Sequence, residues 1–585
     1  MTTKTIQVPS AFSSKTYQSK NKVYSIKTIF WIVAIVLGAL QAWANRYTIS
    51  SEDGISYLDI ADAYLRGEWN LAINPHWSPL YSWLIGLALY ILKPSPYWEF
   101  GVVKLVNFII YLFSLLCFDF FLDNLISYYN QKNSIGSIYN YLKIPKWIWL
   151  VSGYTLFLWS ALKWLGIHCD TPDILTAAFV YLAAGIVLRI NIQSATWFNF
   201  ITLGIVLGLG YLSKTVMFPI AFVFLGVAMF STGNFRSSLK RTIVALLIFA
   251  IITTPFITAI STAKGRITIG EAGRLSYAWY ISPRVADHHW HGEPPGSGTP
   301  KHPTRQIFSQ PKVFEFATPI NTTYPVWYDP SYWNDGLKAK FNLIKQIKTI
   351  VKNIIYYQKQ FLGILLFVYL IFICVKGDFL VSIKNLAENW LLLLPALAGL
   401  GIFMLTTDMA FLVLEAQKST RYIAPFVVLL FAAVFSSMRF RDSVTVKRLI
   451  VGMTVATFVI SSILLSFQGA KDFVTVFKEP KHIDWQVASS LHQLGVESGA
   501  KVANLGKADY FWARLARFKI VAEIPEPIKF WSQDDVVKAK ALEAVAKTGA
   551  KVIVYKPQLE LPNSSSTVGW RKLGNTEFYA YLLQK

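Results

Sequence analysis

The chain has 585 residues, of which 54% are hydrophobic and only 15% are charged, and its mean hydropathy is +0.41. This balance excludes an ordinary soluble domain and a disordered chain, and it favours a protein that crosses a membrane several times. The formal net charge of +23 does not indicate nucleic acid as a partner, because Lys and Arg gather in short segments between apolar runs. That distribution is typical of membrane proteins whose basic loops stay in the cytoplasm near anionic lipid.

The first element in chain order is an apolar helix that follows a basic tail. Residues 1–27 contain five lysines and no acidic residue. The apolar run from about Phe30 to Ala44 comes after this tail and is expected to remain as a signal anchor rather than to be cleaved. The basic flank predicts that the N-terminus lies in the cytoplasm and that this first helix leads outward.

Eleven further apolar segments follow, most of them close to the length that crosses a bilayer. They cover residues 79–92, 100–122, 147–165, 174–190, 198–212, 216–230, 242–260, 361–375, 390–407, 422–438 and 449–467. Together with the first helix, they predict an all-α polytopic membrane protein with about 12–13 transmembrane helices.

The charges between these segments constrain the topology. Basic clusters place the connections at 131–146, 236–241, 376–384 and 439–448 in the cytoplasm. The connections at 166–173, 213–215, 264–358 and 408–420 then lie outside, together with the C-terminal tail. This arrangement requires residues 79–122 to cross a net odd number of times, with 79–92 as a half-helix or as one arm of a hairpin.

Two polar regions stand apart from the apolar segments. Residues 264–358 form a long loop whose many aromatic residues argue against disorder. His288, His289 and His291 of this loop lack a carboxylate at a metal-binding spacing and are expected to be solvated. Residues 469–585 alternate between helix and strand patterns, which predicts a small extracytoplasmic α/β domain without a GxGxxG motif.

These boundaries divide the chain into five parts. We expect a cytoplasmic tail at 1–27, a transmembrane module at 28–263, the large loop at 264–358, further transmembrane helices at 359–468 and the α/β domain at 469–585.

The first outer loop, residues 46–78, carries the residues with the clearest chemistry. On a helix, Asp53 and Tyr57 share one face, and such an amphipathic helix would lie along the membrane surface. A carboxylate there can act as a general base on an acceptor hydroxyl, or bind the cation that balances a pyrophosphate-like leaving group. Alternatively, Asp53 caps the helix that begins nearby.

The order of residues in this loop resembles that of a known family. It runs Asp53, Tyr57, Ala61, Gly67, Pro75 and then Pro79-Leu80-Tyr81 at the next apolar segment. This pattern resembles the protein-O-mannosyltransferase and aminoarabinose-transferase-like branch of the GT-C glycosyltransferases. The resemblance implies a GT-C fold, in which Asp53 matches the catalytic Asp. The family often has Asp-Glu in that order, whereas this chain has Glu52-Asp53. Which of the two carboxylates faces the acceptor is therefore left open.

A second acidic site is expected at the outer entrance of a later helix. His168-Cys-Asp-Thr-Pro-Asp173 resembles the family segment in which an Asp lies across the cavity from the first. Asp173 fits the family spacing better than Asp170, so the resemblance implies a catalytic role for Asp173 and substrate binding by Asp170. The alternative is that Asp170 or Thr171 caps the helix, with Pro172 in its first turn.

Two cationic matches complete the resemblance. Gly208-Leu-Gly-Tyr-Leu-Ser-Lys214 resembles the family's Gly…Lys signature, where the cation meets a lipid phosphate, although Lys214 could instead extend to the interface. Arg421-Tyr422 resembles a late Arg-Tyr pair, and a guanidinium fork suits a phosphate, but an interfacial anchor is the alternative. Tyr57 and His76 of the first outer loop are also expected to bind substrate.

On this resemblance, the expected function is an inverting glycosyl transfer at a bacterial plasma membrane. The donor is expected to be a polyprenyl-phosphate-linked sugar and the acceptor a hydroxyl of a glycan, lipid or protein on the extracytoplasmic face, with Asp53 as the base. Whether the reaction uses a divalent cation, Mg²⁺ or Mn²⁺, is left open, and no metal ligands are assigned. The alternatives are a lipid-linked polysaccharide ligase or polymerase, a transporter of polyprenyl-linked glycans, and a non-catalytic scaffold.

Overall fold

The computed structural model describes residues 11–134, 142–193, 196–282, 288–363, 365, 379–411, 420–440, 442–478, 481–506, 510–557 and 569–583. The predicted crossing at 361–375 lies mostly outside these residues, as do parts of the predicted connections at 131–146, 376–384, 408–420 and 439–448.

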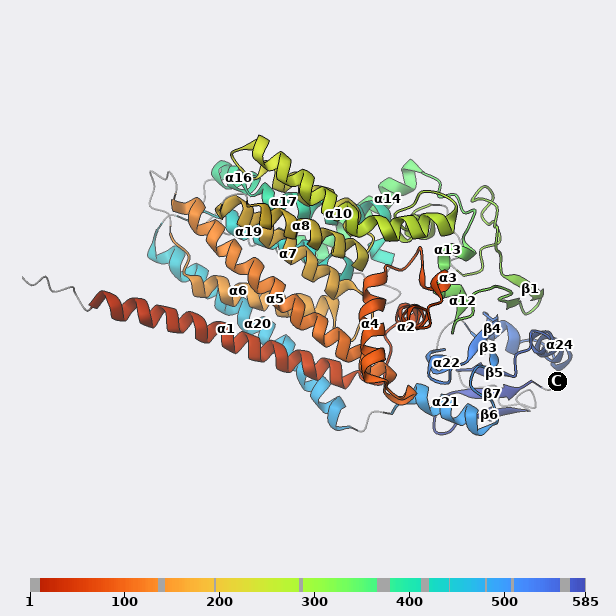
Figure 1. Cartoon of the computed structure of the whole chain (residues 1–585). Coiled ribbons are helices and arrows are strands. Elements are labelled where there is room, and N and C mark those ends of the chain that lie inside the picture. Colours follow the sequence, from red (N-terminus) through yellow and green to blue (C-terminus); the bar gives the residue numbers. More distant parts are fainter. Residues whose placement is uncertain are drawn as a thin grey trace, which may run out of the picture.

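A bundle of helices forms the body of the molecule, and an α/β domain covers one end of it (Figure 1). We call this the domain end and the other the opposite end. The bundle helices are α1 (Ala11–Ala44), α5 (Glu99–Ser134), α6 (Lys146–Trp159) with its continuation η2 (Ser160–Leu165), α7 (Asp173–Gln193), α8 (Trp197–Ser213), α9 (Met217–Phe230), α10 (Phe235–Lys264), α17 (Trp390–Thr406), α19 (Thr420–Ser437) and α20 (Val444–Phe477). Within the described residues, seven helices are long and apolar enough to cross a membrane. The chain is therefore a multi-pass integral membrane protein.

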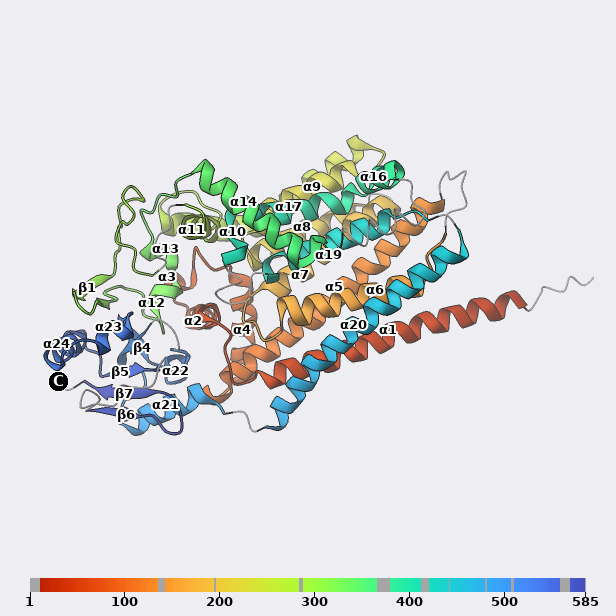
Figure 2. The same cartoon turned by 180° about the vertical axis from the view of Figure 1, so that it is seen from behind.

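Helix α4 (Pro79–Leu92) runs across the domain end instead of along the bundle (Figures 1 and 2). Proline at its first turn suits a helix start, and just before it Ser78 Oγ lies 3.4 Å from Thr215 Oγ1 at the domain end. After α4, the chain passes η1 (Pro96–Trp98) and reaches Glu99, which contacts the α/β domain. Both ends of α4 thus lie at the same end of the bundle. Within 79–122 only α5 runs the length of the bundle, which satisfies the odd number of crossings that the charge pattern requires.

Helix α2 (Glu52–Leu65) lies at the domain end and packs on α4. Ser51 is its extended N-cap. The positive end of the helix dipole stabilises the two acidic residues of the first turn, Glu52 and Asp53. Gly54 allows a close approach, because a Cβ atom there would lie 2.8 Å from Asp170 Cβ. The short helix α3 (Trp69–Ala72) and the loop up to Ser78 complete the first outer loop.

The α/β domain contains alternating helices and strands, as the sequence pattern of residues 469–585 predicts. They are α21 (Ile483–Gln493), β3 (Lys501–Leu505), β4 (Lys519–Ile524), α24 (Asp535–Ala546), β5 (Val552–Tyr555) and β7 (Tyr579–Leu582), joined by α22 (Phe511–Leu515), α23 (Pro527–Trp531) and β6 (Trp570–Lys572). Strand β3 pairs in parallel with β4 and β5, and these apolar strands are almost wholly buried, as central parallel strands usually are.

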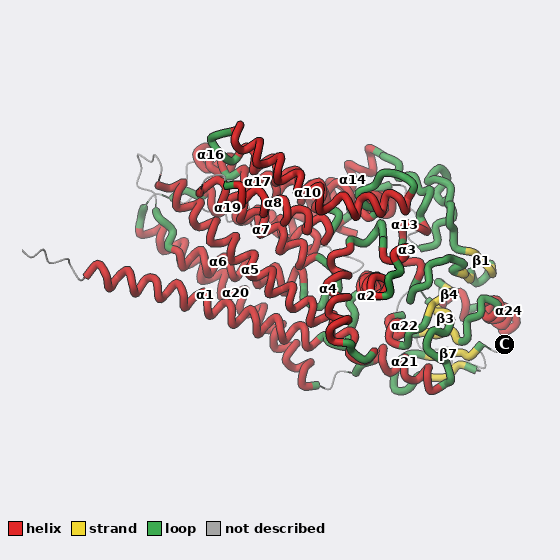
Figure 3. Tube along the Cα trace, in the orientation of Figure 1, coloured by secondary structure: helices red, strands yellow, loops and turns green. Residues whose placement is uncertain are grey.

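Two strands of this sheet come from the large loop rather than from the C-terminal residues. The hairpin β1 (Arg305–Phe308) and β2 (Val313–Glu315) joins the sheet through β2, which pairs with β4, to give the order β1-β2-β4-β3-β5-β7-β6. Strands occur only at this end of the described chain (Figure 3). The rest of the loop forms α11 (Ala272–Tyr280), α12 (Pro325–Tyr328), α13 (Pro330–Trp333) and α14 (Leu343–Tyr357), and η3 (Gln358–Leu362) and α16 (Phe379–Glu388) follow it. The loop and the C-terminal residues therefore fold together.

Candidate active site

Asp53 lies in the first turn of α2, where two donors hold its carboxylate. Its Oδ1 accepts a hydrogen bond from Nε1 of Trp327 at 3.1 Å, and its Oδ2 lies 3.3 Å from Nη2 of Arg421. The side chain is 16% exposed, so it remains within reach of a ligand. The N-cap of α2 is Ser51, so Asp53 is not the residue that caps this helix.

Arg421, in the first turn of α19, joins two carboxylates from distant parts of the chain. Besides its contact with Asp53, its Nε lies 3.3 Å from Oδ2 of Asp173, the first residue of α7. The side chain is only 6% exposed, and its Nη1 has no hydrogen-bond partner among the described residues. A buried donor without a partner is costly, so this nitrogen is available to a ligand that enters the site.

Lys214 and Tyr422 complete this group. The Lys214 ammonium, just after the C-terminus of α8, pairs with Oδ1 of Asp173 and lies 4.3 Å from the centroid of the Tyr422 ring. The Tyr422 hydroxyl accepts a hydrogen bond from Nη2 of Arg421 at 3.1 Å. We call Asp53, Asp173, Lys214, Arg421 and Tyr422 the charged cluster. Its two carboxylates balance its two cations.

Asp170 is separate from this cluster and fully buried. Its carboxylate accepts hydrogen bonds from Nζ of Lys104 at 2.6 and 2.7 Å, from Nδ2 of Asn107 at 3.2 Å and from the backbone N–H of Ser50 at 2.8 Å. These contacts tie α5 and the first outer loop to the segment before α7. Asp170 therefore holds together the elements that carry the site, and its expected contact with substrate stays a prediction.

Tyr57 and His76, the two other residues expected to bind substrate, are buried beside the cluster. The Tyr57 ring packs 5.3 Å from that of Trp77, and burial, reinforced by the charge of Asp53, raises the pKa of Tyr57 well above its usual value. The His76 ring lies 4.4 Å from that of Trp77 and 5.9 Å from that of Trp279. Burial lowers the pKa of His76 to about 4, so its imidazole is neutral at neutral pH.

Glu52 lies near two buried tyrosines, Tyr324 and Tyr510. Burial raises the pKa values of Tyr324 and Tyr510, and the charge of Glu52 contributes to both shifts. Tyr510 belongs to the α/β domain. Of the two adjacent carboxylates, Asp53 is the one that contacts Arg421.

Two residues at the site were not predicted as site residues. Trp327 lies in an aromatic run of the large loop and stacks on Trp279 at 5.9 Å and on His288 at 5.2 Å, so it forms an aromatic wall beside Asp53. Lys104 is the only basic residue of the apolar run 100–122, and a charge in such a run is a signal of a specific role that the sequence already contains. His289, expected to be solvated, is instead buried against Glu523 of the α/β domain.

A divalent cation does not fit the cluster as it stands. Mg²⁺ binds in near-octahedral geometry and prefers oxygen ligands. Asp53 and Asp173 are both engaged by Arg421, and no group of three or more His, Cys, Asp or Glu gathers as a metal site among the residues that the structure describes. The described residues of the charged cluster therefore do not form a metal site as they stand.

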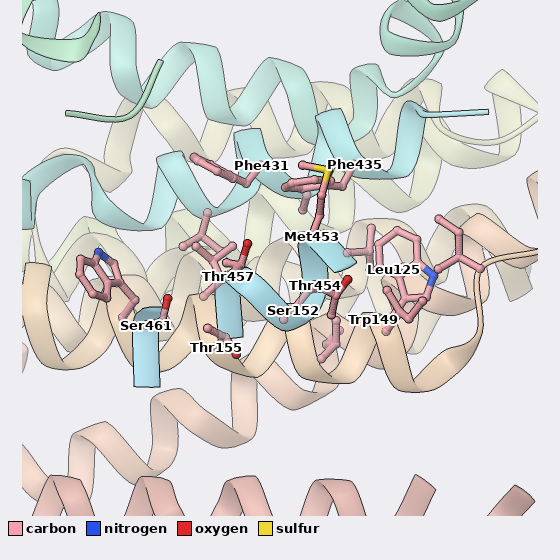
Figure 4. A pocket seen from close by; sticks show the side chains of 18 of the residues that line it. Leu125, Trp149, Ser152, Thr155, Phe431, Phe435, Met453, Thr454, Thr457 and Ser461 are labelled. Atoms are coloured by element: carbon pink, nitrogen blue, oxygen red, sulfur yellow. The ribbon is translucent and has the colours of Figure 1, made fainter. Parts of the chain in front are cut away.

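An apolar cavity of about 660 Å³ lies within the bundle between α5, α6, α19 and α20. Aromatic, aliphatic and hydroxyl side chains surround it, among them Trp149, Thr155, Phe431, Met453 and Thr457 (Figure 4). Helix α19 links the cavity to the charged cluster. Val428, Phe431 and Phe435 line the cavity at seven, ten and fourteen residues after Arg421, on roughly the same face of the helix.

No family model matches the sequence, and neither does any curated protein. Among solved structures, ArnT from Cupriavidus metallidurans bound to undecaprenyl phosphate is similar with a TM-score of 0.47 and 10% identity, over 94% of this chain and 97% of that chain. The Archaeoglobus fulgidus oligosaccharyltransferase in complex with Zn and sulfate has a TM-score of 0.45 and 12% identity, over 90% of this chain and 68% of that chain. The oligosaccharyltransferase AglB from the same organism, with an inhibitory peptide and a dolichol-phosphate, has a TM-score of 0.43 and 12% identity, over 92% and 69%.

Each of these likenesses has a TM-score below 0.5 and an identity below 25%. At this level of likeness, the role of each residue in this chain is argued from its own geometry.

Proposed function

We propose that the protein is a GT-C-type glycosyltransferase that moves a sugar from a polyprenyl-phosphate carrier to an acceptor hydroxyl on the extracytoplasmic face. The observation that carries this proposal is the charged cluster itself. It combines a reachable carboxylate, a buried guanidinium with an unpartnered nitrogen, and an ammonium. Helix α19 leads from it to an apolar cavity inside the bundle.

In this proposal, Arg421 and Lys214 bind the phosphate of the carrier. A guanidinium can pair with two phosphate oxygens, and Nη1 and Nε of Arg421 are donors without a hydrogen-bond partner among the described residues. Lys214 has further N–H groups besides the one directed at Asp173. Because Val428 lies seven residues after Arg421, about 10 Å along α19, a prenyl chain attached to the phosphate can enter the cavity.

Asp53 is the proposed general base. It takes the proton of the acceptor hydroxyl, and the hydroxyl oxygen forms a bond to the anomeric carbon on the side opposite the phosphate. The bond between that carbon and the phosphate oxygen breaks, and the oxygen leaves with the electron pair as polyprenyl phosphate. This attack inverts the anomeric centre. Arg421 and Lys214 stabilise the charge that develops on the leaving oxygen.

The aromatic wall supports a sugar substrate. Trp327 contacts Asp53 and stacks on Trp279, and flat aromatic surfaces suit the apolar faces of a sugar ring. His76 is neutral and its Nδ1 has no partner among the described residues, so it can exchange a hydrogen bond with a sugar hydroxyl. Which sugar and which acceptor are used is a question for substrate screening.

The test uses purified protein in lipid, radiolabelled polyprenyl-phosphate sugars and a cell-envelope extract as acceptor. We compare the wild type with Asp53→Asn and with the control Asp335→Asn, which changes a carboxylate of the large loop paired with Lys301. Loss of a general base lowers the rate by about 10²- to 10⁴-fold, so Asp53→Asn should lose transfer while the control retains it.

Equal transfer by the wild type and Asp53→Asn would show that the base is another residue. If the wild type consumes none of the carriers, glycosyl transfer itself is the wrong function, and transport or binding of the carrier must be considered.

A further inference from the structure

Arg514 joins the α/β domain to the transmembrane module through a buried ion cluster. The residue lies on α22, and its side chain is 5% exposed. Its Nη1 lies 2.7 Å from Oδ1 of Asp59 and 2.7 Å from Oδ2 of Asp62, both on α2. Its Nε donates a hydrogen bond to Oε1 of Glu99, the first residue of α5, at 2.5 Å. One side chain therefore connects three carboxylates on two helices.

The neighbouring residues complete this cluster. Arg517 pairs with the second carboxylate oxygen of Glu99. Asp59 also accepts hydrogen bonds from the backbone N–H and the hydroxyl of Thr323, both at 2.9 Å. Burial raises the pKa of Asp59 even beside Arg514. For Asp62, burial is opposed by the charge and hydrogen bond of Arg514 together with the charges of Arg517 and Arg66, and the pKa is lowered. The guanidinium of Arg514 thus offsets part of the cost of burying these carboxylates.

The same helix presents Asp53 to the charged cluster. Asp53 and Asp59 are six residues apart, so they point in directions that differ by about 120° around α2. One side of α2 contacts Arg421 and Trp327, and the other is fixed by Arg514. A rotation of α2 would therefore move the Asp53 carboxylate relative to the guanidinium of Arg421.

We propose that Arg514 is a positioning residue, through which the α/β domain sets the orientation of α2 and hence the place of the Asp53 carboxylate. This inference rests on the proposed function, in which Asp53 is the reacting base. The α/β domain then forms part of the framework of the active site, although none of its described residues belongs to the charged cluster. Displacing a reacting group by about 1 Å can lower the rate by about 10²-fold.

The test compares Arg514→Lys with the wild type in the full-length protein. Lysine keeps the positive charge, but its single ammonium cannot reproduce the planar fork that reaches three carboxylates. Asp62→Asn is a milder variant, because Asp62 is 26% exposed and Asp59 and Glu99 keep their contacts. Lys538→Met is the matched control, since this buried lysine pairs with Asp535 inside the α/β domain.

We expect Arg514→Lys to lower kcat by about 10²-fold while the KM of the polyprenyl donor changes little, because Arg421 and Lys214 stay in place. Asp62→Asn should show a smaller fall of the same kind, and Lys538→Met should resemble the wild type. Hydrogen–deuterium exchange should increase over residues 52–65 in the Arg514 and Asp62 variants, with the bundle helices unchanged.

The exchange measurement needs no catalytic activity, so it separates this inference from the proposed function. Unchanged exchange over 52–65 in Arg514→Lys overturns the positioning role, whether or not the wild type transfers sugar. An unchanged kcat alongside increased exchange also overturns it, because α2 would then move without consequence for the reaction. A rise in donor KM at constant kcat would instead assign Arg514 to donor binding.

Discussion

His76 is the titratable residue of the site for which folding has the clearest effect on proton binding. Its pKa falls from about 6.5 in an unfolded chain to about 4, because burial disfavours the charged imidazolium. Between these values the unfolded chain binds the proton and the folded protein does not. The stability contributed by neutral His76 is therefore present above about pH 6.5 and is lost as the pH falls towards about 4.

We expect His76→Asn to weaken this dependence on pH. The wild type should lose up to about 1.4 kcal/mol per pH unit through this residue within the window, and the variant should lose correspondingly less. Thermal unfolding in detergent, followed by tryptophan fluorescence at several pH values, measures the difference. His302→Asn is the control, because His302 is a half-exposed residue of the large loop. A slope unchanged by His76→Asn would mean that folding does not shift the pKa of His76.

At the residue scale, the sequence predicts which side chains matter better than it predicts their partners. The order and sidedness of the motifs lead to Asp53, Asp173, Lys214 and Arg421, which the structure brings into contact. Trp327 is 274 positions from Asp53 in the chain, and no local pattern links the two. Contacts of this kind depend on how the helices pack, which spacing along one chain does not encode.

At the scale of elements, α19 connects the polar and the apolar parts of the proposed site. Arg421 lies in its first turn, and the residues that line the cavity follow at intervals of three, four and seven. Such spacing gives one face of the helix two environments, a charged one at the domain end and an apolar one deeper in the bundle. A lipid with a phosphate head and a hydrocarbon tail matches this order, with its phosphate in the charged environment and its tail in the apolar one.

Ala432→Trp should therefore discriminate between carriers of different chain length. Ala432 lines the cavity, and an indole there would occupy space that a long prenyl chain needs. Loss of contact with two methylene groups, about 1.6 kcal/mol, corresponds to about a tenfold higher KM for a long-chain carrier. A short-chain carrier of the same sugar should be unaffected. Leu397→Trp on α17 is the control, because Leu397 is exposed on the outside of the bundle.

The elements also show what sequence patterns predict well and what they miss. Long apolar runs such as those of α5 and α10 predict their helices, because burial in a bilayer requires about 20 apolar residues in sequence. The strands β1 and β2 were missed, since they are only four and three residues long and depend on β4, more than two hundred residues later, for pairing. Helix α4 was ambiguous because its length does not distinguish a crossing from a helix that lies across the bundle.

At the scale of the whole molecule, the two ends of the bundle differ in charge and in structure. The domain end carries the charged cluster, the large loop and the α/β domain, whereas the start of α1 lies at the opposite end (Figures 1 and 2). The opposite end also contains the basic connections at Arg236, Lys240 and Arg241 and at Arg439, Lys447 and Arg448. Basic connections usually remain in the cytoplasm, so we propose that the domain end lies outside.

This orientation can be tested by labelling single cysteines in intact cells. In a background without Cys117, Cys169 and Cys374, Ser532→Cys introduces an exposed thiol on the α/β domain, and Gly233→Cys introduces one between α9 and α10 at the opposite end. A membrane-impermeant maleimide should label Ser532→Cys in intact cells, and should label Gly233→Cys only after the membrane is opened.

The reverse pattern would place Asp53 and Arg421 in the cytoplasm, beside soluble nucleotide sugars. A lipid-linked donor would then have no advantage over a nucleotide sugar, and the proposed function would lose its physical basis. If only Ser532→Cys on the α/β domain is labelled in intact cells, the site faces outward, and the lipid-linked donor would come from the outer leaflet. The prenyl chain would then enter the bundle from the side of the membrane at which α19 begins.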